Sequence, residues 1–378
     1  MKGGKWLAAV CLASAAVLFA LAGCAPGTSG GTEGPRELTF AENLCEEYVN
    51  WYGRCRIEDG AVCFNNSASG FEVRFSGTSL SAEIYSTTVV SAEYAGDPAV
   101  YVLVDGETDY TRAERIELDG YGSAETVALA EGLEAGEHTV RVLKCTQAKY
   151  GEARLLKLMA DGGFLAPPAK ATLKVELIGD SILSGCEAMV EEGLPDSGLL
   201  RNENSLASYG YIAASALGAQ VSAVCRAGAL VSGYNSLPSL PDYYDLVDEF
   251  SDELWDFSCY LPDIVIVDLG TNDLGNGAPE AFYAERYAQF LGHVRDLYPS
   301  ALIVCCTGAM NSLCDEPVGQ MVGRLQAAGD EKICHYTLPV QYAAGHPRER
   351  HHRENGEALA QYIASLLDLP NGQETKAE

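Results

Sequence analysis

The sequence predicts two parts in series, an all-β sandwich over residues 38–168 and an α/β domain over residues 171–369. Three observations indicate this division. The chain has 378 residues, which is longer than one ordinary domain. In the first part apolar and polar residues alternate with a period of two, as in half-buried strands. In the second part apolar runs alternate with segments of helical period, which is typical of a doubly wound α/β domain.

The amino terminus has the pattern of a bacterial lipoprotein signal peptide, predicted over residues 1–23. Lys2 and Lys5 precede the apolar run Trp6–Ala22, which is short for a membrane-spanning helix and suits a secretory signal. Leu21–Cys24 resembles a lipobox, so Cys24 is expected to carry the lipid anchor of an exported, cell-surface protein. The alternatives are an uncleaved anchor or a plain signal peptide.

The two ends of the mature chain are poor in residues that a core could bury. Residues 24–37 are rich in Gly, Thr, Ser and Pro and predict a flexible tether. Residues 370–378 predict a disordered tail. The tether would hold the folded body away from a membrane.

Strands separated by turn signals make up the first predicted part. Ala99–Val104 runs into Asp105-Gly106, a turn signal, and Gly162-Gly163 followed by Pro167-Pro168 ends the part. Strands at this spacing favour a β-sandwich. The predicted strands are Phe71–Phe75, Leu80–Ile84, Ala99–Val104 and His138–Leu143.

The second predicted part contains short, continuously apolar strands of the kind that parallel sheets bury on both faces. Helices separate them, and the longest is amphipathic. The predicted strands are Val175–Ile178, Val221–Val224, Ile264–Leu269, Ala301–Cys306 and Ile333–Leu338, and the predicted helices are Ser205–Leu217, Phe282–Leu297 and Glu357–Leu367.

Charge and cysteine content limit the partners. Lys plus Arg total 25 against 53 Asp plus Glu, a net charge of -28, which argues against nucleic acid or an anionic membrane surface as the main partner. No cysteine pair has Cys-x-x-Cys spacing, so no metal and no cofactor are predicted. Cys305 and Cys306 are expected to be buried thiols, and Cys45, Cys55 and Cys63 could supply one disulfide.

Reactive residue types follow the predicted parallel strands. Ser181 follows the strand Val175–Ile178, Gly228 follows the next strand, and Asn272 follows Ile264–Leu269. Because carboxyl ends of parallel strands meet at one edge of a sheet, these residues should lie together. Acyl transfer by serine needs a nucleophile, a base and donors for the developing oxyanion. Ser181 and His346 would be the first two, and the N–H groups of Ser181 and Gly228 with the Asn272 amide would form the oxyanion hole.

These four sites also carry a family resemblance. Gly179–Ile182, Gly228, Gly270–Asp273 and His346-Pro347 resemble the four blocks of the SGNH, or GDSL-type, hydrolases. Other segments resemble carbohydrate esterase family 2, in which a jelly-roll precedes the hydrolase domain. They are Asn50–Arg54, Phe75–Leu80, Gly132–His138, Pro238–Tyr244 and Trp255–Ser258.

The resemblance implies more than the spacing of residues establishes. It implies a jelly-roll sandwich, then an SGNH domain of flavodoxin-like, three-layer α/β/α architecture. It also implies a serine esterase that removes acetyl groups from acetylated carbohydrate. The alternatives are a catalytically inactive glycan-binding lipoprotein and an esterase or lipase that acts on a non-carbohydrate ester.

One departure from the family pattern concerns the acid that orients the histidine. Family members commonly carry Asp two residues before the histidine, where this chain has Ala344. Loss of that carboxylate costs about four orders of magnitude in a serine protease. A backbone carbonyl, Glu349 or Asp315 could orient the imidazole of His346 instead.

Other polar and aromatic residues near the motifs have competing interpretations. Asp180 is expected to do structural work rather than to serve as the acid. Trp255 and Tyr234 could stack on a sugar ring, although packing is the commoner role of such side chains. His351 and His352 lie in a charged run and are expected on a solvated face.

Overall fold

The computed structural model describes residues 34–40, 43–88 and 96–368, which belong to one compact unit. The predictions for the signal peptide, for Cys24, for most of the tether and for the tail lie outside the described residues. In the part of the chain that is described, no helix is long and apolar enough to cross a membrane.

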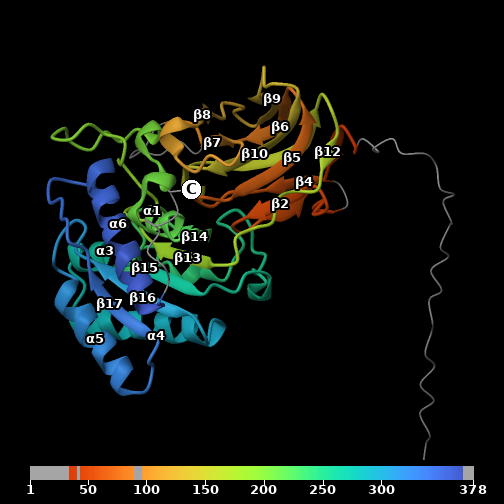
Figure 1. Ribbon diagram of the computed structural model, residues 1–378. Coiled ribbons are helices and arrows are strands. Elements are labelled where there is room, and N and C mark those ends of the chain that lie inside the picture. The colour runs from red at the N-terminus through yellow and green to blue at the C-terminus, as the bar shows by residue number, and fades with distance from the viewer. Residues whose placement is uncertain (1–33, 41–42, 89–95, 369–378) are drawn as a thin grey trace, which may run out of the picture. The chain divides into compact units, whose positions relative to one another are not determined.

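The first part of the chain, here called the β part (residues 34–168), consists of two antiparallel sheets (Figure 1). One sheet has the order β3-β4-β11-β6-β9 with β1 beside β11, and the other has the order β12-β5-β10-β7-β8 with β2 beside β5. The strands are β1 Glu37–Thr39, β2 Val49–Tyr52, β3 Arg56–Glu58, β4 Ala61–Cys63, β5 Gly70–Gly77, β6 Leu80–Ser86, β7 Ala99–Val104, β8 Glu114–Glu117, β9 Ser123–Ala130, β10 Gly136–Lys144, β11 Ala153–Ala160 and β12 Phe164–Leu165.

A single apolar core lies between the two sheets. Ile84 and Leu155 from one sheet and Val73 and Val140 from the other belong to the same buried cluster. Along β6 buried residues alternate with partly exposed ones, which is the period of two that predicted the strand. The four strands predicted for this part are confirmed, and the jelly-roll connectivity stays a prediction.

The second part, here called the α/β part (residues 171–368), contains one five-stranded parallel sheet in the order β14-β13-β15-β16-β17. This is the strand order of flavodoxin-like folds, and the order reverses at β13. In open α/β sheets, ligands bind outside the carboxyl ends of the strands at such a reversal, which here are the ends of β13 and its neighbours. The strands are β13 Lys174–Gly179, β14 Gln220–Cys225, β15 Ile264–Asp268, β16 Leu302–Thr307 and β17 Ile333–Thr337.

Helices pack against alternate residues of this sheet. Leu177 and Ile266 share a cluster with α1 and α6, whereas Val265 and Ile303 share a cluster with α4 and α5. The helices are α1 Tyr209–Ala216, α2 Pro241–Tyr244, α3 Thr271–Gly275, α4 Glu280–Leu297, α5 Asp315–Ala327 and α6 Glu349–Leu366. The short 3₁₀ turns are η1 Tyr110–Arg112, η2 Ala148–Tyr150, η3 Leu200–Asn202, η4 Ser205–Ala207, η5 Tyr234–Ser236 and η6 Phe257–Cys259.

Two sequence predictions in these elements are wrong. His351 and His352 are buried rather than solvated, because α6 begins at Glu349 and turns both side chains inward. His352 Nδ1 accepts the N–H of Tyr209 at 3.2 Å, so it serves the start of α1. The expected disulfide is also absent, since Cys45, Cys55 and Cys63 are free thiols, as are the other described cysteines. The prediction that Cys305 and Cys306 are buried thiols is confirmed.

The β part and the α/β part share a buried polar interface. The Arg54 guanidinium, from the β part, lies 3.1 Å from the Glu176 carboxylate in β13, and both side chains are almost fully buried. Arg54 also donates to the carbonyl oxygens of Tyr244 and Leu246. A buried ion pair of this kind couples the stability of the two parts, because either charge without its partner would be buried and uncompensated.

Candidate active site

The residues singled out from the four motif blocks meet at the carboxyl end of the parallel sheet. Ser181 follows β13, Gly228 follows β14, Asn272 lies in α3 directly after β15, and His346 precedes α6. They converge because β13 lies between β14 and β15, at the point where the strand order reverses.

A sharp turn after β13 positions Ser181. Asp180 Oδ1 accepts the backbone N–H of Ile182 at 2.9 Å and so stabilises the turn. A side chain at Gly179 would lie 2.7 Å from the Leu183 side chain, so glycine is needed there for close packing. Ser181 is buried to 7% exposure, and its Oγ lies 2.8 Å from His346 Nε2.

The other nitrogen of the imidazole contacts Asp196. His346 Nδ1 lies 2.7 Å from Asp196 Oδ2, and the backbone N–H of His346 also donates to this carboxylate. Burial raises the pKa of Asp196, but hydrogen bonds from His346 and Arg348 outweigh it and lower the pKa to about 2. An ionised carboxylate only accepts, so Nδ1 carries the proton and Nε2 is left to accept from the Ser181 hydroxyl.

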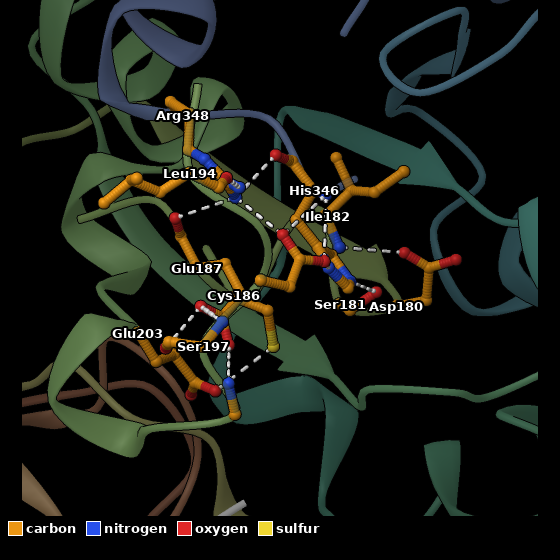
Figure 2. A network of polar contacts seen from close by, with 12 residues as sticks. Asp180, Ser181, Ile182, Cys186, Glu187, Leu194, Ser197, Glu203, His346 and Arg348 are labelled. Carbon is orange, nitrogen blue, oxygen red and sulfur yellow. Dashed lines mark hydrogen bonds and ion pairs between the residues drawn. The ribbon is translucent and has the colours of Figure 1, made fainter. Parts of the chain in front are cut away.

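Buried charged residues hold the loop that carries Asp196, and Figure 2 shows two of them, Arg348 and Glu187, beside Leu194 and Ser197 of this loop. Arg348 Nη1 donates to Asp196 Oδ1 at 2.8 Å, and Nη2 donates to the Leu194 carbonyl at 2.7 Å. The Glu187 carboxylate accepts the N–H and the hydroxyl of Ser197 at 2.8 and 2.7 Å. Arg348 is 2% exposed and Glu187 is fully buried, so the Asp196 loop is attached to rigid groups rather than left in solvent.

Asp196 is the functional candidate that the sequence reasoning missed. Of the carboxylates considered instead, Glu349 accepts from the Tyr110 hydroxyl at 2.7 Å, and Asp315 begins α5; no contact joins either one to His346. The segment around Asp196, Leu194-Pro-Asp-Ser-Gly198, has the composition of an ordinary turn. The signal in the sequence was the glycine directly before His346: Gly345 has φ +146°, and a Cβ there would lie 2.6 Å from Asp196 Oδ1.

The predicted oxyanion donors differ in whether they already donate a hydrogen bond. No acceptor among the described residues takes the backbone N–H of Ser181 or of Gly228. Asn272 Nδ2 donates to Asp180 Oδ2 at 2.9 Å and to the Ala229 carbonyl at 3.1 Å. These contacts fix the plane of the Asn272 amide beside the end of β13, and an oxyanion bound there would compete with one of them.

Two buried carboxyl groups lie behind the serine turn. Asp180 directly follows β13 and lies near Asp268 of β15, because the register pairs Gly179, the last residue of β13, with Asp268. Burial and the nearby Asp268 raise the pKa of Asp180 well above its usual value. Burial raises the pKa of Asp268 to about 7, against the hydrogen bond from the Tyr209 hydroxyl at 2.8 Å. Asp180 thus does the structural work expected of it, since it holds Ile182 and Asn272.

The two aromatic candidates lie in different places. Trp255 is half-buried, and its ring lies 5.7 Å from the Arg54 guanidinium, which pairs with Glu176. Tyr234 is half-exposed in η5, and its ring packs 6.2 Å from that of Phe282. In the described part of the chain no three His, Cys, Asp or Glu side chains are grouped as metal ligands would be.

Comparison with known proteins adds two family matches. Residues 51–168 match the carbohydrate esterase 2 N-terminal family, and residues 177–371 match the GDSL-like lipase/acylhydrolase family. The chain is 31% identical over 319 residues to the cellulase/esterase CelE of Acetivibrio thermocellus, covering 80% of this chain and 37% of that protein. It is 30% identical over 274 residues to an acetylxylan esterase / glucomannan deacetylase of Cellvibrio japonicus, covering 70% of this chain and 72% of that protein.

Solved structures show the same architecture. A family two carbohydrate esterase from Clostridium thermocellum, in complex with cellohexaose, superposes with a TM-score of 0.76 at 28% identity. That alignment covers 85% of this chain and 99% of the other. A family two carbohydrate esterase from Cellvibrio japonicus has a TM-score of 0.75 at 25% identity, covering 88% and 98%. This chain therefore spans whole chains of these structures but little more than a third of CelE.

Proposed function

This chain belongs to the family 2 carbohydrate esterases and is a carboxylic ester hydrolase, and we propose that it removes O-acetyl groups from polysaccharide through an acyl-serine intermediate. The motif blocks predicted this family from the sequence. The observation that carries the mechanism is the continuous chain from Ser181 Oγ through the His346 imidazole to the Asp196 carboxylate.

The first half-reaction follows from that chain of contacts. The Ser181 oxygen attacks the acetyl carbon while its proton passes to His346 Nε2, and the acetyl oxygen becomes an oxyanion. Asp196 stabilises the imidazolium that forms. The N–H groups of Ser181 and Gly228 donate to the oxyanion, and the Asn272 amide exchanges one of its present acceptors for it. His346 then protonates the sugar oxygen, which leaves as the C–O bond breaks.

The second half-reaction uses the same groups in reverse. His346 Nε2 takes a proton from water, and the water oxygen attacks the acetyl-serine carbonyl. Collapse of the second oxyanion breaks the bond to Ser181 Oγ, which recovers its proton from His346. Acetic acid leaves and gives its proton to water as acetate, and the free enzyme is restored.

The net charge of the chain and the names of its relatives favour a neutral acetylated glycan as substrate. A net charge of -28 disfavours polyanionic polysaccharides. Relatives carry the names acetylxylan esterase and glucomannan deacetylase, and acetylated glycans of those kinds are the first substrates to test. The alternative of an inactive glycan binder is motivated by the β-sandwich and by Ala344; the contact of Asp196 Oδ2 with His346 Nδ1 supports an active enzyme despite Ala344.

Acetate release from acetylated xylan and glucomannan tests the proposal. The wild type should release acetate and should become labelled by a fluorophosphonate, and Ser181→Ala should lose both activities. Ser215→Ala, which changes an exposed serine of α1, is the matched control and should keep both. A preference for longer acyl esters over acetate would favour a lipase instead, and activity retained in Ser181→Ala would contradict the acyl-serine mechanism.

The proposal includes attachment to the cell surface through Cys24, supported by the lipobox-like Leu21–Cys24 after an apolar run. Growth with a labelled fatty acid should label the wild type but not Cys24→Ala. Equal labelling of the two would contradict the anchor.

A further inference from the structure

A segment of the β part reaches the loop that carries Gly228. Gln147 Oε1 accepts the N–H of Ala227 at 2.6 Å, and Lys149 Nζ donates to the carbonyl oxygen of Ala227 at 3.2 Å. Ala227 directly precedes Gly228. Both backbone groups of the residue before the proposed oxyanion donor are therefore bonded to side chains of the β part.

The loop itself has the features of a type II turn. The N–H of Ala229 donates to the carbonyl of Arg226 at 3.1 Å, and Gly228, the third residue of the turn, has φ +76°. In a type I turn the third residue has φ of about −90°, against about +80° in type II, and the second residue has ψ of about −30° against about +120°. The two types thus differ mainly by a reversal of the central peptide, here Ala227–Gly228.

That central peptide contains both the carbonyl that Lys149 binds and the Gly228 N–H. In a trans peptide these two groups point in opposite directions. A donor that holds the carbonyl of Ala227 on the side of the β part therefore keeps the Gly228 N–H directed away from it. Reversal of the peptide would break the bond to Lys149 and would turn the N–H away from its present direction.

We propose that Lys149 is a positioning residue for catalysis, which holds and polarises the Ala227–Gly228 peptide so that the Gly228 N–H serves the oxyanion. This inference rests on the proposed esterase function. A charged donor on the carbonyl also polarises the peptide and makes its N–H a stronger donor. The β part is then a component of the active site.

The side chain of Gln147, which contacts Ala227 next to Lys149, has a fixed orientation. Its Nε2 donates to Glu203 Oε2 at 2.9 Å, and its backbone N–H donates to Glu203 Oε1 at 2.6 Å. Because a carboxylate accepts from an NH₂ group, the amide oxygen of Gln147 faces Ala227. Gln147 and Glu203 are fully buried, so they anchor the segment from which Lys149 extends.

Gly228 is glycine because of its backbone conformation rather than for lack of space. A Cβ built there meets no atom within 4 Å, but φ of +76° lies in the region that side chains disfavour. Gly228→Ala should therefore fit sterically while shifting the turn towards type I. This variant removes the donor through which Lys149 is proposed to act.

Steady-state kinetics of acetate release on Lys149→Met test the proposal. Loss of one oxyanion donor costs about 100- to 1,000-fold in kcat, so loss of the residue that only orients it should lower kcat about tenfold, with KM little changed. Lys149→Arg keeps the charge and a donor and should retain most of the activity. Lys170→Met is the matched control, because Lys170 Nζ also donates to a backbone carbonyl, that of Trp51, at 3.2 Å.

A double variant separates this role from a structural one. If Lys149 acts through the Gly228 N–H, adding Lys149→Met to Gly228→Ala should cost no further activity. Multiplicative losses, or a Lys149→Met variant with unchanged kcat, would overturn the inference. These outcomes are read only against a wild type whose acetate release depends on Ser181, so failure of the esterase function itself would be recognised first.

Discussion

Asp196→Asn is the substitution that tests the site most directly. Asp196 Oδ1 accepts from Arg348 Nη1, whereas Oδ2 faces His346 Nδ1. Because the Arg348 guanidinium can only donate, the oxygen of an asparagine must face Arg348, and its NH₂ group must face His346. The NH₂ group would select the imidazole with its proton on Nε2, which cannot accept the proton of Ser181.

Upper and lower bounds can be given for the expected loss in kcat. Asp196→Ala removes a charge-assisted hydrogen bond, which contributes about 1.5–3 kcal/mol, or about 10- to 150-fold in kcat. Asp196→Asn should cost more, towards the ~10⁴-fold seen when asparagine holds the wrong tautomer in a serine protease. The Asp196 side chain is 34% exposed, and water can partly replace it, so we expect a loss of about 10³-fold for Asn.

The assay measures kcat for acetate release by each variant. Thermal unfolding of the same variants confirms that they are folded. The order of the two variants is decisive: Asn must be slower than Ala. An Asp196→Asn enzyme as fast as the wild type, or an Ala variant slower than Asn while both remain folded, would refute the role given to this carboxylate.

Two further predictions concern stability. Arg54→Met should lower the free energy of unfolding, measured in denaturant, by about 3–5 kcal/mol, because it leaves the buried Glu176 carboxylate without its cation. Adding Glu176→Gln should recover most of this loss. An Arg54→Met protein as stable as the wild type would contradict this explanation. Burial, with smaller effects of His346 and His351, lowers the pKa of His352 to about 3. Stability should therefore fall as pH drops from about 6.5 towards 3, since only the unfolded chain binds the proton there, by at most about 5 kcal/mol. His352→Asn, which keeps an acceptor for the Tyr209 N–H, should flatten that slope, and an unchanged pH profile would count against it.

The local pattern of the sequence was sufficient for the strands that it predicted and for the order of the motif blocks. The alternation along β6 reflects burial of one face of the strand, and the continuous apolar run of β15 reflects burial of both faces. Each pattern can be read from adjacent residues of a single segment. Ser181, Gly228 and Asn272 could be grouped because parallel strands bring their carboxyl ends to one edge, which follows from topology alone.

Tertiary structure decided the contacts between segments that are distant in the chain. Asp196 meets His346 across 150 positions, from a turn of ordinary composition, while the expected place for an acid holds Ala344. His352 is buried although its neighbours in the sequence are charged, because the inward face of α6 packs on α1.

The contact of Lys149 with Ala227 likewise joins the two parts of the chain, which the sequence presents as separate units. The physical reason is common to all of these cases. Periodicity reports the burial of one element, whereas the partner of a charged or hydrogen-bonding side chain is set by which remote backbone comes within about 3 Å of it. The sequence alone predicted the main strands and the family of this protein, and only the folded chain decided which groups contact His346 and the Ala227–Gly228 peptide.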